Sequence, residues 1–169
     1  MMRRCKSIFG VWIIGIIFFL SAQSHGQTKE APSSITAALL VKVIGFEKNI
    51  SANDIIIYVL GSNELYSELK KVIGQANIKG VQSGNTLPSS KPSILFVADQ
   101  RKVDAATKYT QDNKVLSATN IPDLVSEGVT LGFGIGDDNK PKILLNVTSS
   151  AKEGLDWNPA IMKVAQVIK

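Results

Sequence analysis

Residues 55–60, Ile-Ile-Ile-Tyr-Val-Leu, decide the fold class, because every position in this stretch is apolar or aromatic. A strand with one face in water alternates apolar and polar side chains, whereas a strand of a parallel sheet is buried on both faces and does not alternate. Gly61-Ser62-Asn63 follows at once, and Leu65, Leu69 and Val72 then recur at helical spacing. A buried strand followed directly by an amphipathic helix predicts a parallel sheet covered by helices.

The same pattern continues on both sides of this unit. Residues 94–98 (ILFVA) form a second buried strand, which Asp99 follows as a helix cap, and residues 115–118 form a third. A weaker strand is expected over residues 78–82. Upstream, Ser33 or Ser34 is expected to cap a helix, and its predicted apolar face consists of Ile35, Ala38, Leu39, Val43 and Phe46.

The C-terminal third predicts a β-hairpin followed by a helix. Residues 129–135 and 142–147 are apolar runs on either side of the turn sequence Gly136 to Lys140, in which Gly136 is expected to supply a positive φ. Asn158 as cap and Pro159 at the first helical position predict a closing helix through Ile168. The fold class expected is therefore an α/β three-layer sandwich with a mainly parallel sheet and an antiparallel C-terminal hairpin.

The first 26 residues have the organisation of a secretion signal. Arg3, Arg4 and Lys6 precede a 13-residue apolar run, residues 8–20, which is shorter than the roughly 20 residues of a membrane-spanning helix. Small residues around 24–26 suit cleavage before Gln27. We expect a cleaved signal peptide over residues 1–26, a flexible mature N-terminus over 27–33, and one domain over 34–169, located in the periplasm.

Cleavage changes what the composition allows. The full chain has 19 basic and 14 acidic side chains, and removing the three basic side chains of residues 1–26 leaves 16 and 14. Cys5 and His25, the only cysteine and histidine, are removed as well. A mature chain without either residue has no thiol nucleophile, no histidine-dependent triad and no zinc site of the Cys/His type. The small remaining charge indicates no nucleic-acid partner, and no membrane insertion is expected after cleavage.

Other motifs point to structure rather than to chemistry. Gly132-x-Gly134-x-Gly136 lacks the spacing and the strand-to-helix position of a phosphate loop. Asp137-Asp138-Asn139 lacks the later bidentate glutamate of a calcium loop. No serine lies in a nucleophile-elbow pattern, and no two acids share an apolar context that would suit acid–base catalysis. We therefore predict that the protein is not an enzyme and uses no metal and no cofactor.

A polar rim is expected where the parallel strands end. Gly61, Ser62, Asn63, Asp99 and Asn120 directly follow the three buried strands, and ligands of open α/β sheets bind beyond the carboxyl ends of their strands. These five residues are the candidate ligand-binding residues. Ser and Asp are also preferred helix caps, and ordinary capping is the favoured interpretation of Ser62 and Asp99.

The order and spacing of these motifs resemble the YfiR family of small exported bacterial proteins. In the C-terminal half the resemblance rests on Val115-Leu116, residues 128–135 (GVTLGFGI), residues 142–146 (KILLN), Ala151, Gly154-Leu155 and residues 161–165. Upstream it rests on residues 37–42 with Phe46, residues 56–61 and residues 94–97. Together these stretches cover roughly residues 33–169.

The resemblance implies an α/β sandwich without catalytic machinery. It also implies a periplasmic regulator that binds the exported sensor region of an inner-membrane signalling enzyme, a diguanylate cyclase or a histidine kinase, and so affects biofilm formation. Association of two copies of the chain into a homodimer is also left open. The alternative is a periplasmic protein that binds a small ligand at the polar rim.

The sequence departs from the family pattern at two places. Many relatives carry an aromatic residue followed by proline after the first helix, whereas Phe46 is followed here by Glu47-Lys48-Asn49. Some relatives form disulfides, which this mature chain cannot do. The first departure leaves the nature of that corner of the molecule open, and the second removes redox control.

Overall fold

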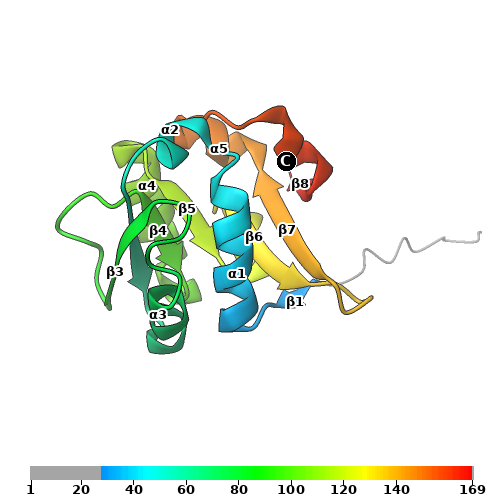
Figure 1. The fold of residues 1–169 in the computed structure, drawn as a ribbon, viewed down its shortest axis with the longest axis horizontal. Coiled ribbons are helices and arrows are strands. Elements are labelled where there is room, and N and C mark those ends of the chain that lie inside the picture. The colour runs from blue at the N-terminus through cyan, green and yellow to red at the C-terminus, as the bar shows by residue number, and fades with distance from the viewer. Residues whose placement is uncertain (1–27, 169) are drawn as a thin grey trace, which may run out of the picture.

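The computed structural model describes residues 28–168, which form a sheet of eight strands with helices on both faces (Figure 1). The strand order is β3-β2-β4-β5-β6-β7-β8, and β1 pairs with β6 beyond the end of β5. All pairs are parallel except β6–β7 and β1–β6. The strands are β1 (Lys29–Glu30), β2 (Ile55–Leu60), β3 (Ile78–Gly84), β4 (Ile94–Val97), β5 (Leu116–Thr119), β6 (Leu131–Ile135), β7 (Pro141–Asn146) and β8 (Ala165–Ile168).

The helices form the two outer layers. The α-helices are α1 (Ser33–Ile44), α2 (Lys48–Ser51), α3 (Asn63–Lys70), α4 (Val103–Asn113) and α5 (Val147–Glu153). The 3₁₀ helices are η1 (Gln100–Lys102), η2 (Pro122–Val125) and η3 (Pro159–Lys163). In Figure 1, α1 and α3 lie in front of the sheet, and α4 lies at its back. This arrangement confirms the predicted α/β sandwich with its mainly parallel sheet and antiparallel hairpin.

Alternate side chains of the central strands serve the two layers. Ile57, Val59 and Phe96 belong to the core cluster that includes the buried face of α1, whereas Leu60 and Leu95 belong to the cluster under α4. All five side chains are fully buried. The continuous apolar run of residues 55–60 is therefore required, because each face of β2 contacts a layer of helices.

The end of the chain differs from the helix that the sequence predicts. Asn158 does act as a cap, because its side chain accepts from the Ala160 amide at 3.0 Å, and Pro159 is the first residue of η3. The helix ends after Lys163, and residues 165–168 form β8, which pairs in parallel with β7. A short apolar run is compatible with either state, and the free edge of β7 provides hydrogen bonds that decide for a strand.

The segment before α1 also differs from prediction. Residues 27–33 were expected to form a flexible N-terminus, but Lys29–Glu30 pair with β6 and Ala31 is buried. Helix α1 begins at Ser33 with Pro32 as its N-cap, so neither serine caps it. Its core face consists of Ser33, Thr36, Ala37, Leu40, Val43 and Ile44. The face that the sequence predicts is therefore rotated about the helix axis relative to the buried face. Ala38 is exposed, and Ile35 and Leu39 are only half-buried.

The hairpin turn is stabilised by a different residue from the one expected. Asn139, and not Gly136, has the positive φ, at 57°. Gly136 lies close to the flexible ends of the Lys142 and Asp138 side chains, which would have to move aside for a Cβ at this position. Asparagine is enriched in this left-handed conformation, so the turn still uses ordinary turn chemistry. The predicted signal peptide lies outside the described residues.

Candidate functional site

The carboxyl ends of β2 and β4 form the topological switch point of the sheet. The chain leaves β2 through α3 on one face and leaves β4 through α4 on the other, so the two connections diverge. A crevice at this point is the usual ligand position in open α/β folds. Three of the five predicted rim residues, Gly61, Ser62 and Asp99, adjoin these strand ends directly, and Asn63 begins α3.

Gly61 and Asp99 are in direct contact at the switch point. Gly61 has a φ of +94°, and a Cβ added to it would lie 2.7 Å from the Cβ of Asp99. Positive φ and close approach both require glycine here. The backbone therefore brings β2 and β4 together so tightly that no side chain fits between their ends.

We expect Gly61→Ala to lower the free energy of unfolding by about 2 kcal/mol, because alanine would be strained at positive φ and would displace Asp99. Chemical denaturation measures the change. Gly45→Ala is the matched control, since Gly45 has a φ of −66° and open space around it. Equal stability of the two variants would contradict the tight approach of β2 to β4.

Ser62 and Asn63 serve the start of α3. The Ser62 hydroxyl oxygen accepts from the Leu65 amide at 3.2 Å, which is an N-cap hydrogen bond. The Asn63 carbonyl accepts from the Ser67 hydroxyl at 2.9 Å, and the Asn63 side chain is exposed. The favoured capping interpretation of Ser62 thus has a direct structural counterpart.

Asp99 is a cap and also the centre of a small ion-pair cluster. One carboxylate oxygen accepts from the Arg101 amide, and the two oxygens face the Arg101 guanidinium at 3.0 and 2.9 Å. Lys102 Nζ lies 3.5 Å from the same carboxylate. The hydrogen bond from the Arg101 side chain lowers the pKa of Asp99 to about 2. Two cations thus share one carboxylate, so these three side chains together carry one excess positive charge.

Asn120 is separated in its contacts from the other four residues. It is 6% exposed, and its Nδ2 donates to the Glu30 carboxylate of β1. Its buried Oδ1 has no hydrogen-bond partner among residues 28–168. The structure thus brings Gly61 and Asp99 together, while Asn120 connects the end of β5 to β1.

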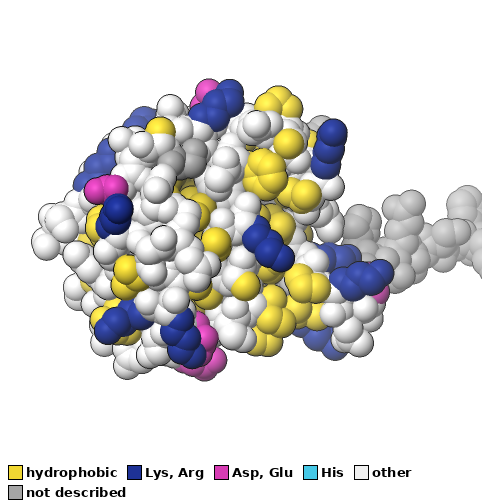
Figure 2. Space-filling model, in the orientation of Figure 1, with side chains coloured by type: hydrophobic (Ala, Val, Ile, Leu, Met, Phe, Trp, Pro, Cys, Tyr) yellow, Lys and Arg dark blue, Asp and Glu magenta, His cyan; other side chains and the backbone are white. Residues whose placement is uncertain are grey.

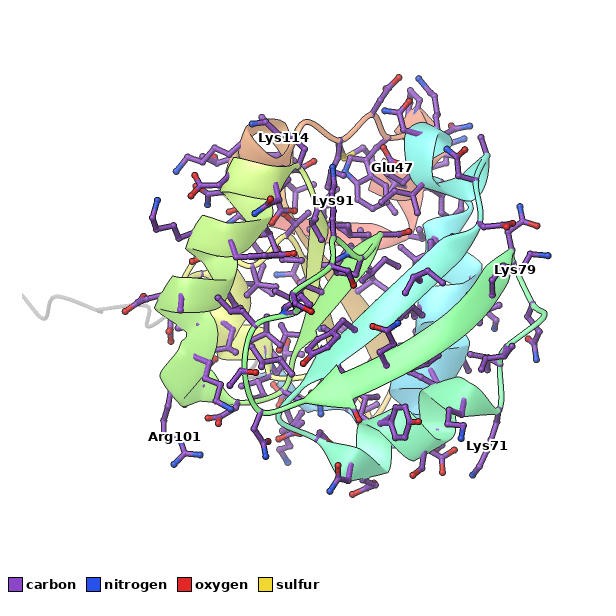
Figure 3. The ribbon with its side chains drawn as sticks, turned by 90° about the vertical axis from the view of Figure 1, so that its left-hand side faces the viewer. Glu47, Lys71, Lys79, Lys91, Arg101 and Lys114 are labelled. Carbon is purple, nitrogen blue, oxygen red and sulfur yellow. The ribbon has the colours of Figure 1, made fainter. Side chains whose placement is uncertain are left out.

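A groove that the sequence did not reveal lies beside the switch point. It has a volume of about 450 Å³ and is lined by Leu60, Asn85, Thr86, Leu87, Lys102 and Ala105. In Figure 3 the loop after β3 runs between α4 and β3, starting from the end of the molecule at which Arg101 lies. The sequence of this loop is that of an ordinary polar surface loop, and only its position over Leu60 makes it part of a groove.

A second hollow lies near the amino end of β4, at the other end of the strands from the groove. It adjoins Lys91 and Lys114, which Figure 3 shows at the same end of the molecule. Its volume is about 260 Å³, and Asn49, Ile50, Asn53, Pro92 and Ser93 complete its lining. Lys114 Nζ donates to the Lys152 carbonyl at 2.7 Å and so helps to hold α5. This hollow is smaller than the groove at the carboxyl ends of the strands, and it lies away from the switch point.

Exposed apolar side chains gather at the end of the chain. Met162, Val164 and Val167 are 50%, 50% and 40% exposed, and all three belong to η3, β8 or the junction between them. Figure 2 shows hydrophobic side chains grouped over this segment at the upper right and along the adjoining side of α1. We call Met162, Val164 and Val167 the C-terminal apolar surface.

The described residues carry no feature of a metal centre or a membrane span. Between residues 28 and 168, no three His, Cys, Asp or Glu side chains are placed to hold a metal ion together. None of the helices in that range has the length and hydropathy required to cross a bilayer.

The fold is that of a small α/β protein whose strands β2 to β6 have the flavodoxin-like order, with the switch point between β2 and β4. Residues 33–166 match the family described as YfiR/HmsC-like, and the chain belongs to that family. Members of this family are generally regulatory rather than catalytic, are typically periplasmic, and act in biofilm signalling. No curated protein matches the sequence of this chain.

Two solved structures share the fold at low sequence identity. A conserved domain protein from Vibrio cholerae has a TM-score of 0.58 and 14% identity, with 83% of this chain and 61% of that chain covered. The ABC domain from Streptococcus pneumoniae in complex with L-Trp has a TM-score of 0.54 and 13% identity, with 81% and 60% covered. This chain therefore spans about three fifths of the length of these two proteins.

Proposed function

We propose that the protein is a non-catalytic periplasmic regulator that binds the exported sensor region of an inner-membrane signalling enzyme. The signalling enzyme is a diguanylate cyclase or a histidine kinase, and binding modulates its activity. Family membership supports the regulatory class. The structural observation that carries the proposal is the C-terminal apolar surface on the open edge of the sheet.

This surface combines two features that favour a protein partner. Val164 and Val167 present apolar side chains to solvent, and β8 is the last strand of the sheet. Among residues 28–168 no strand pairs with the outer edge of β8, so its main-chain N–H and C=O groups on that side are available. Natural proteins usually protect such edges with charges or coverings. An extended segment of the sensor region can pair with β8 while its apolar side chains cover Met162 and Val167.

The regulatory effect follows from occupancy. A partner that exists in two states is shifted toward the state that binds the regulator more tightly. The regulator therefore needs differential affinity for the two states and no catalytic group of its own.

Binding to purified sensor regions tests the proposal. The exported regions of the diguanylate cyclases and histidine kinases of the same organism are immobilised singly, and the mature protein is added. We expect saturable binding to one of them. We expect Val164→Glu with Val167→Glu to weaken that binding at least about tenfold, because two charges would be buried without partners. Ile73→Glu is the matched control, since Ile73 is 43% exposed and lies outside the C-terminal apolar surface.

The test has two contrary outcomes. Binding to none of the sensor regions would contradict the proposed partner. Equal loss of binding with Ile73→Glu would contradict the proposed surface. If the double variant instead converts a dimer of the chain into a monomer in light scattering, without changing sensor binding, the surface holds a second copy rather than the sensor.

A further inference from the structure

We propose that the groove lined by Leu60, Leu87, Ala105 and Lys102 binds a small monocarboxylate with an apolar body. This inference is independent of partner binding and concerns the opposite end of the sheet order from β8. It goes beyond the polar rim expected from the sequence, because none of the five rim residues lines the groove, which adjoins the rim through Leu60 and through the Lys102–Asp99 ion pair.

The groove is preformed by hydrogen bonds to its outer wall. Tyr58 on β2 donates its hydroxyl to the Thr86 carbonyl at 2.9 Å. Lys102 Nζ donates to the Asn85 carbonyl at 2.6 Å. Gly84 precedes this wall, and a Cβ there would collide with the Tyr58 hydroxyl. The end of β3 can therefore lie this close to Tyr58 only because residue 84 is glycine. Residues 85 and 86 are therefore held against β2 and η1.

The lining suits an amphipathic ligand. Leu60 forms a fully buried apolar base, and Leu87 and Ala105 add apolar walls. At about 450 Å³ the groove lies within the size range of small-molecule sites. The Asn85 amide and the Thr86 hydroxyl make no side-chain hydrogen bond to any other residue of the described chain, so both are available to a ligand.

The charge of the groove selects an anion. The Asp99 carboxylate is engaged on both oxygens by Arg101, whereas Lys102 is 3.5 Å from it. An ammonium group has three donors, and one of those of Lys102 binds the Asn85 carbonyl. Lys102 is 28% exposed, so a carboxylate in the groove can reach a partly desolvated cation. An ammonium or a purely apolar ligand would not use this charge.

Direct binding to the purified mature protein tests the inference. The probes are 3-phenylpropanoate and hexanoate, with 3-phenylpropan-1-ol and hexan-1-ol as uncharged counterparts. We expect saturable amide chemical-shift changes for the acids at residues 85–87 and 105, and at least about tenfold weaker binding of the alcohols. Lys102→Met is expected to remove the preference for the acids.

Ala105→Leu fills the groove and is expected to abolish binding of both acids. Ala38→Leu is its matched control, because Ala38 is also an exposed alanine within a helix but lies on α1, away from the groove. The inference is overturned if no acid binds at millimolar concentration, if alcohols bind as tightly as acids, or if binding survives Ala105→Leu. None of these outcomes depends on the sensor partner, so failure here leaves the proposed regulatory function standing.

Discussion

Replacing Glu153 with alanine is expected to lower the free energy of unfolding by about 3–4 kcal/mol. Glu153 lies on α5 and is only 1% exposed. Its carboxylate accepts from the Ser117 amide at 3.1 Å, the Ser117 hydroxyl at 2.5 Å and the Thr130 hydroxyl at 2.7 Å. Alanine would leave these donors buried without an acceptor and would also leave a cavity. Urea unfolding measures the change.

Glu153→Gln is the discriminating companion variant. Its amide oxygen can keep the bonds from the Ser117 amide and the Thr130 hydroxyl, while its amide nitrogen donates to the Ser117 hydroxyl oxygen. That hydroxyl loses one acceptor, so a cost of about 1 kcal/mol is expected. A loss as large as that of the alanine variant would show that the charge, and not the hydrogen-bond network, stabilises the junction of α5 with β5.

The stability of the wild-type protein and that of Glu153→Gln should also depend differently on pH. Burial raises the pKa of the Glu153 carboxyl above its ordinary value of 4.5, and the hydrogen bonds from Ser117 and Thr130 limit the rise. The folded state then holds the proton more tightly than the unfolded state, so this contribution to stability is complete below pH 4.5 and is lost as pH rises through the folded pKa. Relative to Glu153→Gln, the wild-type protein should lose stability from about pH 4 upward. Parallel stability curves for the two proteins would contradict this assignment.

The second large effect is expected at Glu47, which is fully buried. One carboxylate oxygen accepts from the Ile50 amide at 2.5 Å and caps α2, and the other accepts from the Asp156 amide at 2.8 Å. Glu47→Ala is expected to lower the free energy of unfolding by about 3 kcal/mol, since two amides lose their acceptor. Thermal and chemical denaturation measure it.

Unlike Glu153→Gln, Glu47→Gln is expected to lose most of the stability that Glu47→Ala loses. Both partners of Glu47 are main-chain N–H groups, which only donate, so the amide nitrogen introduced by Glu47→Gln would face a donor. Asp156→Asn is the control, because it removes the exposed ion pair with Lys48 at 2.9 Å but keeps the main-chain amide that Glu47 binds. Such a surface pair contributes about 0–1 kcal/mol. A control as unstable as Glu47→Ala would mean that the ion pair, rather than the buried carboxylate, holds this corner.

Glu47 also explains how the corner after Phe46 is held together. The Glu47 carboxylate joins the segment after α1 to the Asp156 amide, and the main chain of Glu47 pairs with Trp157. The Asn158 amide also donates to the Phe46 carbonyl at 2.7 Å. The corner is therefore an internal junction between the two ends of the domain.

Prediction from the sequence succeeded where the deciding interactions are local. Residues 55–60 are apolar throughout because both faces of β2 are covered, and that pattern can be recognised without any partner strand. Ser62 caps a helix through an amide only three residues away, and Asn158 does so through an amide two residues away. The order of such signals was enough to predict the sandwich, the hairpin and the family.

Prediction failed where a distant segment decides. Residues 165–168 carry the same side chains whether helical or extended, and the free edge of β7 makes them a strand. Glu153 has the sequence context of a surface residue near a helix end, and only the fold surrounds it with Ser117 and Thr130. The groove at Lys102 exists because Tyr58 and Lys102 hold residues 85 and 86 from elements far away in the sequence.

The amino-acid sequence by itself determined the layers, the parallel strands, the hairpin and the membership in a regulatory family. Hydrophobic periodicity and capping act over a few residues, so they can be recognised directly in a single chain. Only the tertiary structure decided the C-terminal strand with its apolar surface, the two buried carboxylates and the groove beside Lys102. Each of these depends on hydrogen bonds and burial between residues far apart in the chain, which form only when the whole domain closes around them.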